Sequence, residues 1–106
     1  MEIITLKFQI APEIYTTVLK NINAIIAPTV IQPGCLDCYV YRGVEDKTSL
    51  LFIERWNNVE QMRKHLRSED FKVILAMMEL SQIKPEFCIQ KISDTKGIDE
   101  LTELLC

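Results

Sequence analysis

Two side chains in this sequence are suited to acid–base chemistry, a glutamate and the only histidine. Glu54 lies within the apolar run Leu50–Trp56, and His65 lies in the segment Val59–Leu66, three residues after Met62. Imidazole titrates near neutral pH, so His65 could act as a base or as a hydrogen-bond partner for a phenolic substrate. It could equally be a partly buried histidine that is hydrogen-bonded to the backbone. Both interpretations remain open from the residues alone.

Strand alternation gives Glu54 three apolar neighbours on its own face: Leu50, Phe52 and Trp56. A carboxylate on such a face loses its hydration unless a partner compensates. The partner could be Arg42 or Lys91 across the sheet, or Glu54 could orient His65 or receive a substrate proton. The indole N–H of Trp56 also requires a partner if it is buried, and the mouth of a pocket would suit it.

Two tyrosines form a second group of candidate residues. Tyr39 and Tyr41 alternate with Cys38 and Val40, so both hydroxyls are expected on one face of the strand Leu36–Arg42. A tyrosine beside a pocket can hydrogen-bond a phenolate, whereas a tyrosine at a dimer interface contributes contact area. The spacing is compatible with either role.

The cysteines include a Cys-x-x-Cys pair, Cys35 and Cys38, a spacing found in zinc and redox sites. This pair begins a strand, where positions i and i+3 point to opposite faces, and a zinc site would need two more ligands. Cys88 and Cys106 add no pairing pattern, and no glycine-rich loop is present to bind a nucleotide or a flavin. We therefore expect free thiols, no metal and no cofactor.

Hydrophobic periodicity and turn residues predict the elements that must position these side chains. They are a strand at Glu2–Ile10, a helix from Pro12 that ends at Ala27–Pro28, strands at Leu36–Arg42 and Leu50–Trp56, helical segments at Val59–Leu66 and Phe71–Met78, a strand at Glu86–Ile92, and a helix at Asp94–Leu105. The order β-α-β-β-α-β followed by a helix predicts an α+β, ferredoxin-like fold with an antiparallel sheet.

Composition limits the class of protein. The 106 residues are 48% hydrophobic and 25% charged, which excludes disorder and leaves room for a single core. The net charge of −3 shows no basic excess for nucleic acid. No apolar run is long enough to span a membrane, and the first residues do not resemble a signal peptide. We therefore expect a cytoplasmic protein with neither nucleic acid nor membrane as a partner.

The run Leu50–Ile53 is apolar on both strand faces. Helices of a chain of this size can cover only one face of the sheet, so the other requires a second copy. The sequence therefore predicts a homodimer, with the C-terminal helix available to cross the partner.

Several motifs together resemble the antibiotic biosynthesis monooxygenase domain. They are the turn and strand Pro33–Tyr39 (a "PGCL" turn), the Glu-x-Trp at the end of Leu51–Trp56, the histidine in Met62–Leu66, and the Ser-x-x-Phe formed by Ser68 and Phe71. The resemblance covers about residues 2–92. It implies a dimeric α+β barrel, with residues 1–93 as the domain and 94–106 as a helical tail.

The resemblance also implies an activity. Enzymes of this family oxidise phenolic or quinol substrates with O₂, without metal or flavin, although related domains include isomerases and proteins with no known activity. The implied residues are His65, Glu54 and Trp56 as catalytic groups and Tyr39, Tyr41, Phe52 and Phe71 as substrate-binding groups. The alternatives are a non-catalytic ligand-binding or dimerisation module and a small-molecule isomerase.

Two positions depart from the family pattern. Phe52 stands where some of the oxygenases carry Asn, which argues against an anthrone-type mechanism. Leu75 stands where the haem-degrading branch carries its ligand His, which argues against haem degradation.

Overall fold

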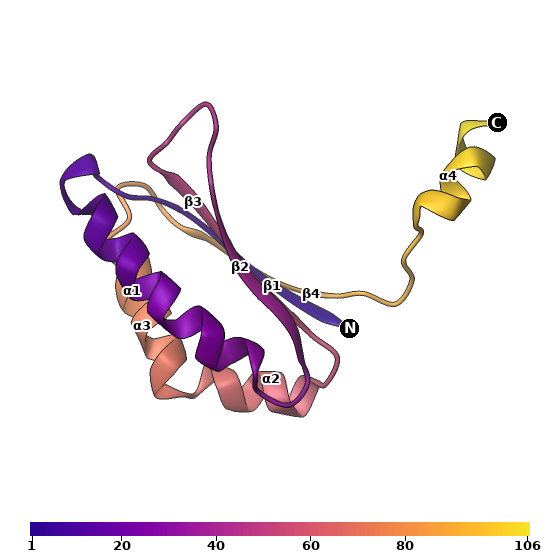
Figure 1. The fold of residues 1–106 in the computed structure, drawn as a ribbon, viewed down its shortest axis with the longest axis horizontal. Helices are drawn as coiled ribbons and strands as arrows, with labels where there is room; N and C mark the ends of the chain where they lie inside the picture. Colours follow the sequence, from indigo (N-terminus) through magenta and orange to yellow (C-terminus); the bar gives the residue numbers. More distant parts are fainter.

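The computed structural model describes the whole chain, from Met1 to Cys106 (Figure 1). Its elements, in chain order, are β1 (Glu2–Gln9), α1 (Pro12–Val30), β2 (Cys35–Arg42), β3 (Ser49–Trp56), α2 (Val59–Leu66), α3 (Glu69–Met78), β4 (Glu86–Lys91) and α4 (Ile98–Leu105). Each strand lies within one residue of its predicted bounds. The second helical region of the predicted βαββαβ order is divided into α2 and α3.

The four strands form one antiparallel sheet with the order β2-β3-β1-β4. Helices α1, α2 and α3 lie on one face, which we call the helix-covered face, and the opposite face carries no helix (Figure 1). We call this second face the open face. The molecule therefore has the predicted α+β, ferredoxin-like fold.

The core follows from strand alternation. Leu6 and Phe8 of β1 and Leu50 and Phe52 of β3 are buried on the helix-covered face, while their sequence neighbours point to the open face. The helices complete this cluster through apolar residues at helical spacing: Val18, Ile22 and Ile25 of α1 and Phe71 and Ile74 of α3. A smaller cluster of Ile4, Trp56 and Met62 lies where β3 ends and α2 begins. This second cluster is the setting of the candidate site.

Helix α1 differs from the prediction, because it continues through Pro28 to Val30 instead of ending at Ala27–Pro28. Proline lacks the N–H that would bond to the carbonyl four residues earlier, so it removes one hydrogen bond from the last turn. Buried Thr29 supports that turn, because its hydroxyl donates to the Ile25 carbonyl at 2.7 Å. The prediction was wrong because one lost bond near a helix end is a small cost.

The C-terminal helix also begins later than predicted, at Ile98 and not at Asp94. Its start is set by Gly97, whose N–H donates to Oε2 of Glu100 at 2.8 Å. Helix α4 lies apart from the sheet and from the other helices (Figure 1), and none of its residues is buried. None of the helices has the length and apolar character needed to cross a membrane.

Candidate functional site

Glu54 lies near the middle of the sheet on its helix-covered face. Strand β3 has neighbours on both sides, and Glu54 is in register with Ile4 of β1 and Cys38 of β2. The carboxylate is fully shielded from solvent, like Phe52 and Trp56 on the same face. The alternation expected from the sequence is therefore correct, and it places a charged group inside the core.

His65 reaches this carboxylate from α2. The helix begins at Asn58, whose side chain accepts a hydrogen bond from the Gln61 N–H at 2.9 Å, as an N-cap should. One turn apart, Met62 and His65 are both buried against the sheet. The start of α2 is also tied to the start of β2, because the Asn57 N–H donates to the Gly34 carbonyl at 2.8 Å.

Glu54, Trp56 and His65 form a buried hydrogen-bonded group, which we call the Glu54 network. The Trp56 indole N–H donates to Oε1 of Glu54 at 2.9 Å, and Nε2 of His65 lies 2.9 Å from Oε2. The His65 ring lies beside Trp56, with ring centroids 5.1 Å apart and planes tilted by 32°. Phe71 meets the same imidazole edge-on, with centroids 5.4 Å apart.

The ionised form of Glu54 determines which nitrogen of His65 donates in the network. An ionised carboxylate only accepts hydrogen bonds, so with Glu54 ionised Nε2 of His65 carries a proton. The second ring nitrogen, Nδ1, is buried and has no hydrogen-bond partner. An unpartnered buried polar atom costs about 1–3 kcal/mol, so such atoms are rare without a functional reason. In neutral His65 this nitrogen is a free lone pair that could accept a proton.

The structure brings together four of the seven candidate residues. His65, Glu54 and Trp56 form the network and Phe71 contacts the imidazole. Phe52 lies two residues before Glu54 on the same face, within the main core.

The two tyrosines lie elsewhere. Tyr39 and Tyr41 are in register with Ile53 and Leu51 and therefore point to the open face, where about half of each side chain is exposed. Their rings contact each other at 6.0 Å between centroids. Within one chain, neither tyrosine can face the His65 imidazole.

The partner of Glu54 also decides between the alternatives that the sequence left open. Arg42 donates instead to the Lys47 carbonyl at 2.8 Å and lies over the Tyr15 ring, and Lys91 is in register with Glu2. Pairing of Glu54 with either cation is therefore wrong. The interpretation of His65 as a histidine bonded to backbone is also wrong, because its partner is a carboxylate.

Cys35 and Cys38 lie on the same face of the sheet, so the prediction that they point to opposite faces is wrong. A β-bulge between Cys35 and Asp37 inserts one residue, so Cys35 is in register with Trp56 and Cys38 with Glu54. Both cysteines therefore lie on the helix-covered face. No group of three or more His, Cys, Asp or Glu side chains is arranged to hold a metal ion.

Both thiols are held in the neutral form. Burial, followed by the negative charge of Glu54, raises the pKa of Cys35 from 9.0 to about 11. The same two causes, in the same order, raise the pKa of the more deeply buried Cys38 further. Because thiolates are the reactive form, these thiols are poorly suited to nucleophilic or redox chemistry at neutral pH.

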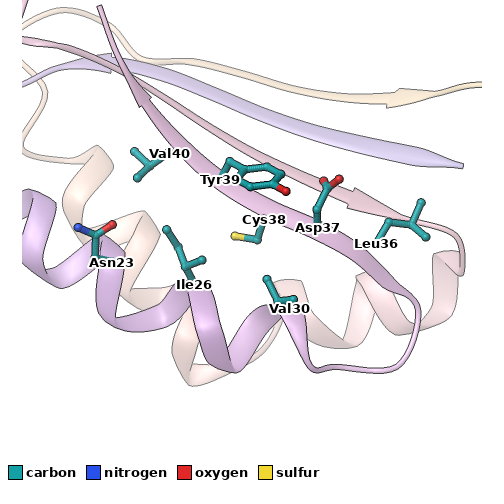
Figure 2. Close-up of a pocket in the computed structure, with 8 residues that line it drawn as sticks. All are labelled: Asn23, Ile26, Val30, Leu36, Asp37, Cys38, Tyr39 and Val40. Atoms are coloured by element: carbon teal, nitrogen blue, oxygen red, sulfur yellow. The ribbon is translucent and has the colours of Figure 1, made fainter. Parts of the chain in front are cut away.

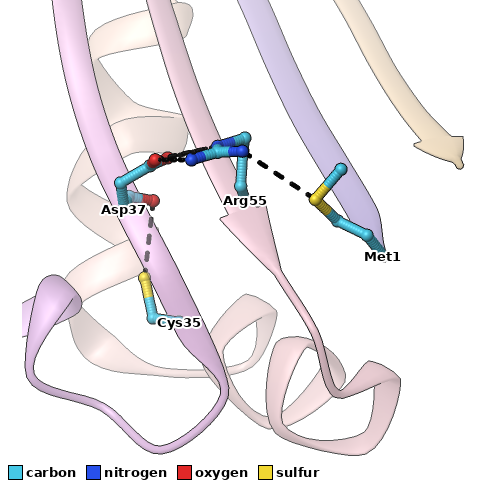
Figure 3. Close-up of polar contacts among 4 residues, drawn as sticks. All are labelled: Met1, Cys35, Asp37 and Arg55. Atoms are coloured by element: carbon cyan, nitrogen blue, oxygen red, sulfur yellow. Dashed lines mark hydrogen bonds and ion pairs between the residues drawn. The ribbon is translucent and has the colours of Figure 1, made fainter. Parts of the chain in front are cut away.

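On the open face, an ion pair joins β2 to β3 (Figure 3). Nε of Arg55 lies 2.9 and 2.8 Å from the two carboxylate oxygens of Asp37, and a second guanidinium nitrogen also donates to Asp37. Hydrogen bonding to Asp37 raises the pKa of Arg55. Sequence reasoning missed this pair, although the register of the two strands would have revealed it.

A cavity of about 440 Å³ opens between α1 and β2, at the edge of the sheet (Figure 2). We call it the α1–β2 cavity, and its lining residues are Asn23, Ile26, Val30, Leu36, Asp37, Cys38, Tyr39 and Val40. It touches the Glu54 network only indirectly, because Cys38 is the cross-strand neighbour of Glu54. No sequence pattern indicated this cavity, since it arises from the way that α1 packs on the edge strand.

The comparisons with known proteins agree with this fold. The family model for antibiotic biosynthesis monooxygenases matches residues 1–77. The chain therefore belongs to the antibiotic biosynthesis monooxygenase family. No protein of curated function matches it in sequence.

Solved structures from several organisms are similar to the chain. A candidate antibiotic biosynthesis monooxygenase from Deinococcus radiodurans has a TM-score of 0.81 at 20% identity, over 92% of this chain and 98% of that one. A conserved protein from Methanosarcina mazei has a TM-score of 0.77 at 25% identity, over 85% and 90%. Rv0793 from Mycobacterium tuberculosis has a TM-score of 0.78 at 18% identity, over 91% and 98%.

Proposed function

We propose that this protein is a cofactor-independent monooxygenase that oxidises a small phenolic or quinol-type aromatic with O₂. One observation carries the proposal: His65 has one ring nitrogen held by the buried Glu54 carboxylate and the other buried without a partner. A carboxylate in this position fixes the tautomer of a histidine and stabilises the imidazolium, as in hydrolase triads. Membership of the antibiotic biosynthesis monooxygenase family supports the same class of chemistry.

In the proposed reaction, Nδ1 of His65 takes the proton of the substrate hydroxyl. The resulting anion is electron-rich and can reduce O₂ directly. For a simple phenol, one oxygen atom forms a new C–O bond on the ring and the other leaves in water, and the substrate supplies all four electrons as it becomes a quinone. Glu54 stabilises the imidazolium, and Trp56 keeps the carboxylate oriented.

The aromatic surroundings support a flat, apolar substrate. The Trp56 and Phe71 rings border the imidazole, and we propose that Phe71, together with Phe52 in the adjoining core, binds the substrate ring. A closed apolar site also excludes water from the reactive anion. Because the network is closed in the free chain, substrate entry requires α2 to move relative to β3.

We further propose that the working unit is a cytoplasmic homodimer in which residues 1–93 form the domain. The open face carries half-exposed Tyr39 and Tyr41, together with partly exposed Leu51 and Ile53, in a continuous apolar strip across two strands. Burying this strip against a second copy removes apolar surface from water. Tyr39 and Tyr41 then contribute to substrate binding only across the dimer interface.

A second candidate function is a non-catalytic ligand-binding or dimerisation module. The observation that favours it is the position of the α1–β2 cavity, which contains none of the three network residues. An isomerase would use the same acid–base groups without consuming O₂.

Oxygen consumption tests these alternatives, with a panel of hydroquinones and polyketide-like phenols as substrates. A general base contributes about 10²–10⁴-fold, so His65→Gln should lower kcat/KM by about that factor. Lys72→Ala on the exposed side of α3 is the matched control and should keep full activity. Full activity of His65→Gln would exclude His65 as the base. Absence of O₂ uptake with every panel member, together with saturable binding of one of them, would favour the module, and conversion without O₂ would favour the isomerase.

A further inference from the structure

Helix α4 presents an apolar face that nothing covers. Ile98, Leu101, Leu104 and Leu105 are 78%, 42%, 63% and 76% exposed. They share one side of the helix, and the acidic residues Asp99, Glu100 and Glu103 occupy the rest of its surface together with Thr102. An amphipathic helix of this length is not stable alone in water and requires an apolar surface to pack against.

The α1–β2 cavity is an apolar surface of suitable shape. Six of its eight lining residues are hydrophobic. Ile26 and Val30 of α1 lie opposite Cys38 and Val40 of β2 across a trough at the edge of the sheet, whereas Tyr39 borders it from the open face (Figure 2). Val30 and Leu36, at the end of this trough, are 39% and 43% exposed. This end of the trough is therefore uncovered, and an aliphatic side chain could enter there.

The chain cannot readily place α4 in its own cavity. The tail leaves β4 at Lys91, and β4 and β2 are the opposite edges of the sheet, about 14 Å apart at the usual strand spacing. Residues 92–97 span about 20 Å when fully extended, so the direct distance is within their reach. To enter the cavity of its own chain, however, the tail would have to pass around α2, which lies at that end of the helix layer, whereas the tail points away from the body (Figure 1).

A second copy removes this difficulty. The register places four residues in one row across the sheet: Lys91 of β4, Glu2 of β1, Trp56 of β3 and Cys35 of β2. The tail, which follows Lys91, therefore leaves from the same end of the sheet at which β2 begins. When two open faces pack around a two-fold axis parallel to the strands, the β4 edge of one copy lies beside the β2 edge of the other. The tail then starts next to the trough of the partner.

We propose that α4 of one chain docks in the α1–β2 cavity of a second copy, and that the two copies exchange their tails. The apolar residues of α4 enter the trough, and its acidic face remains in solvent. The proposal rests on the homodimer of the proposed function and adds the site at which the tail binds. It also explains why both an apolar helix face and an apolar cavity are uncovered in the single chain.

Disulfide trapping in the full-length protein tests the docking. Val30 lines the cavity, and Cys106 directly follows α4. One chain carries Val30→Cys, Cys88→Ser and Cys106→Ser, and the other carries Cys88→Ser alone and is labelled with ¹⁵N. After co-refolding, the mixture is oxidised by air with copper–phenanthroline, and mass spectrometry identifies the linked peptides. Because docking raises the effective concentration of the two thiols, the link should form at least about tenfold faster than with Lys72→Cys on α3.

Variants of the tail separate specific docking from random collision. Leu101→Asp with Leu104→Asp should abolish the rapid linkage, whereas Asp99→Asn on the polar face should keep it. A rate at Val30→Cys no higher than at Lys72→Cys would overturn the proposal. Linkage within one chain, seen when Val30→Cys and Cys106 are on the same chain at high dilution, would overturn it as well. Light scattering of the same samples distinguishes failure of the docking from failure of the homodimer. A dimer without rapid linkage contradicts only the docking of α4, whereas a monomer contradicts the homodimer as well.

Discussion

Oε2 of Glu54 lies 2.9 Å from Nε2 of His65, and both side chains are closed off from solvent. The pair joins the central sheet to α2, and Trp56 holds the other carboxylate oxygen. A buried carboxylate of this kind is costly unless its oxygens are hydrogen-bonded. Here both oxygens have a donor, and within the Glu54 network the atom without a partner is Nδ1 of His65.

The tautomer of His65 is the most direct prediction from this relationship. Because His65 is the only histidine, ¹⁵N-histidine NMR reports it without overlap. We expect the neutral ring to carry its proton on Nε2. In Glu54→Gln, the amide oxygen can still accept from Trp56, so the amide NH₂ faces Nε2 and the proton should move to Nδ1. A wild-type spectrum with the proton on Nδ1 would contradict the assigned hydrogen bonds.

Removal of the imidazole should cost stability as well as activity. His65→Ala leaves the Glu54 carboxylate buried with one donor fewer, and breaking a buried pair in this way costs about 3–5 kcal/mol of unfolding free energy. The double variant His65→Ala with Glu54→Gln keeps no buried charge and should be more stable than His65→Ala alone. Urea unfolding of the three proteins measures both differences. Equal stability of wild type and His65→Ala would mean that the pair contributes nothing to folding.

The face of the sheet that carries Glu54 could be predicted because strand alternation depends only on local sequence. The N-caps of α2 and α3, Asn58 and Ser68, are likewise residue types that favour this position, so the helix starts also depend on local sequence. The partner of Glu54 could not be predicted from the sequence alone. His65 approaches from a different element, and its position depends on how α2 packs on β3.

Two local features were also beyond sequence reasoning. The β-bulge after Cys35 changes which face a residue occupies, and a single inserted residue leaves no distinctive composition. The continuation of α1 through Pro28 depends on tertiary support for its last turn, which local rules for proline do not include. The α1–β2 cavity follows from both, because it lies between that last turn and the bulged strand.

Gly34 offers a test of how the loop before β2 positions the start of α2. Its φ is +86°, and an added Cβ would lie 2.9 Å from Cβ of Asn58 and 3.2 Å from that of Gln61. Gly34→Ala should therefore lower the free energy of unfolding by about 1–3 kcal/mol, through both backbone strain and displacement of the α2 N-cap. Gly97→Ala is the control, since its φ is negative and its nearest contact is the flexible Glu100 side chain at 3.4 Å. Equal losses at the two glycines would contradict this account.

The raised pKa values of the Cys35 and Cys38 thiols predict a loss of stability at alkaline pH. The pKa of Cys35 is 9.0 when unperturbed and about 11 in the folded protein, where burial and Glu54 disfavour the thiolate. Between these two values the unfolded chain loses the proton while the folded chain retains it. Fewer protons are then bound to the unfolded state, so unfolding becomes more favourable as pH rises. We expect the melting temperature to be insensitive to this thiol below pH 9.0 and to fall from there to about pH 11.

Replacement of the thiol isolates its contribution to this alkaline loss. Tyr15 also has a pKa raised by burial, so the wild-type curve contains more than one titrating group. Cys35→Ser has no thiol to ionise and should show a shallower fall in melting temperature over the same pH range, whereas Cys88→Ser, at an exposed site, should reproduce the wild-type slope. Scanning calorimetry at matched ionic strength measures the three slopes. If the Cys35→Ser curve is parallel to that of wild type, the Cys35 thiol contributes nothing to the alkaline loss of stability. That result would contradict a pKa of Cys35 raised by burial beside Glu54.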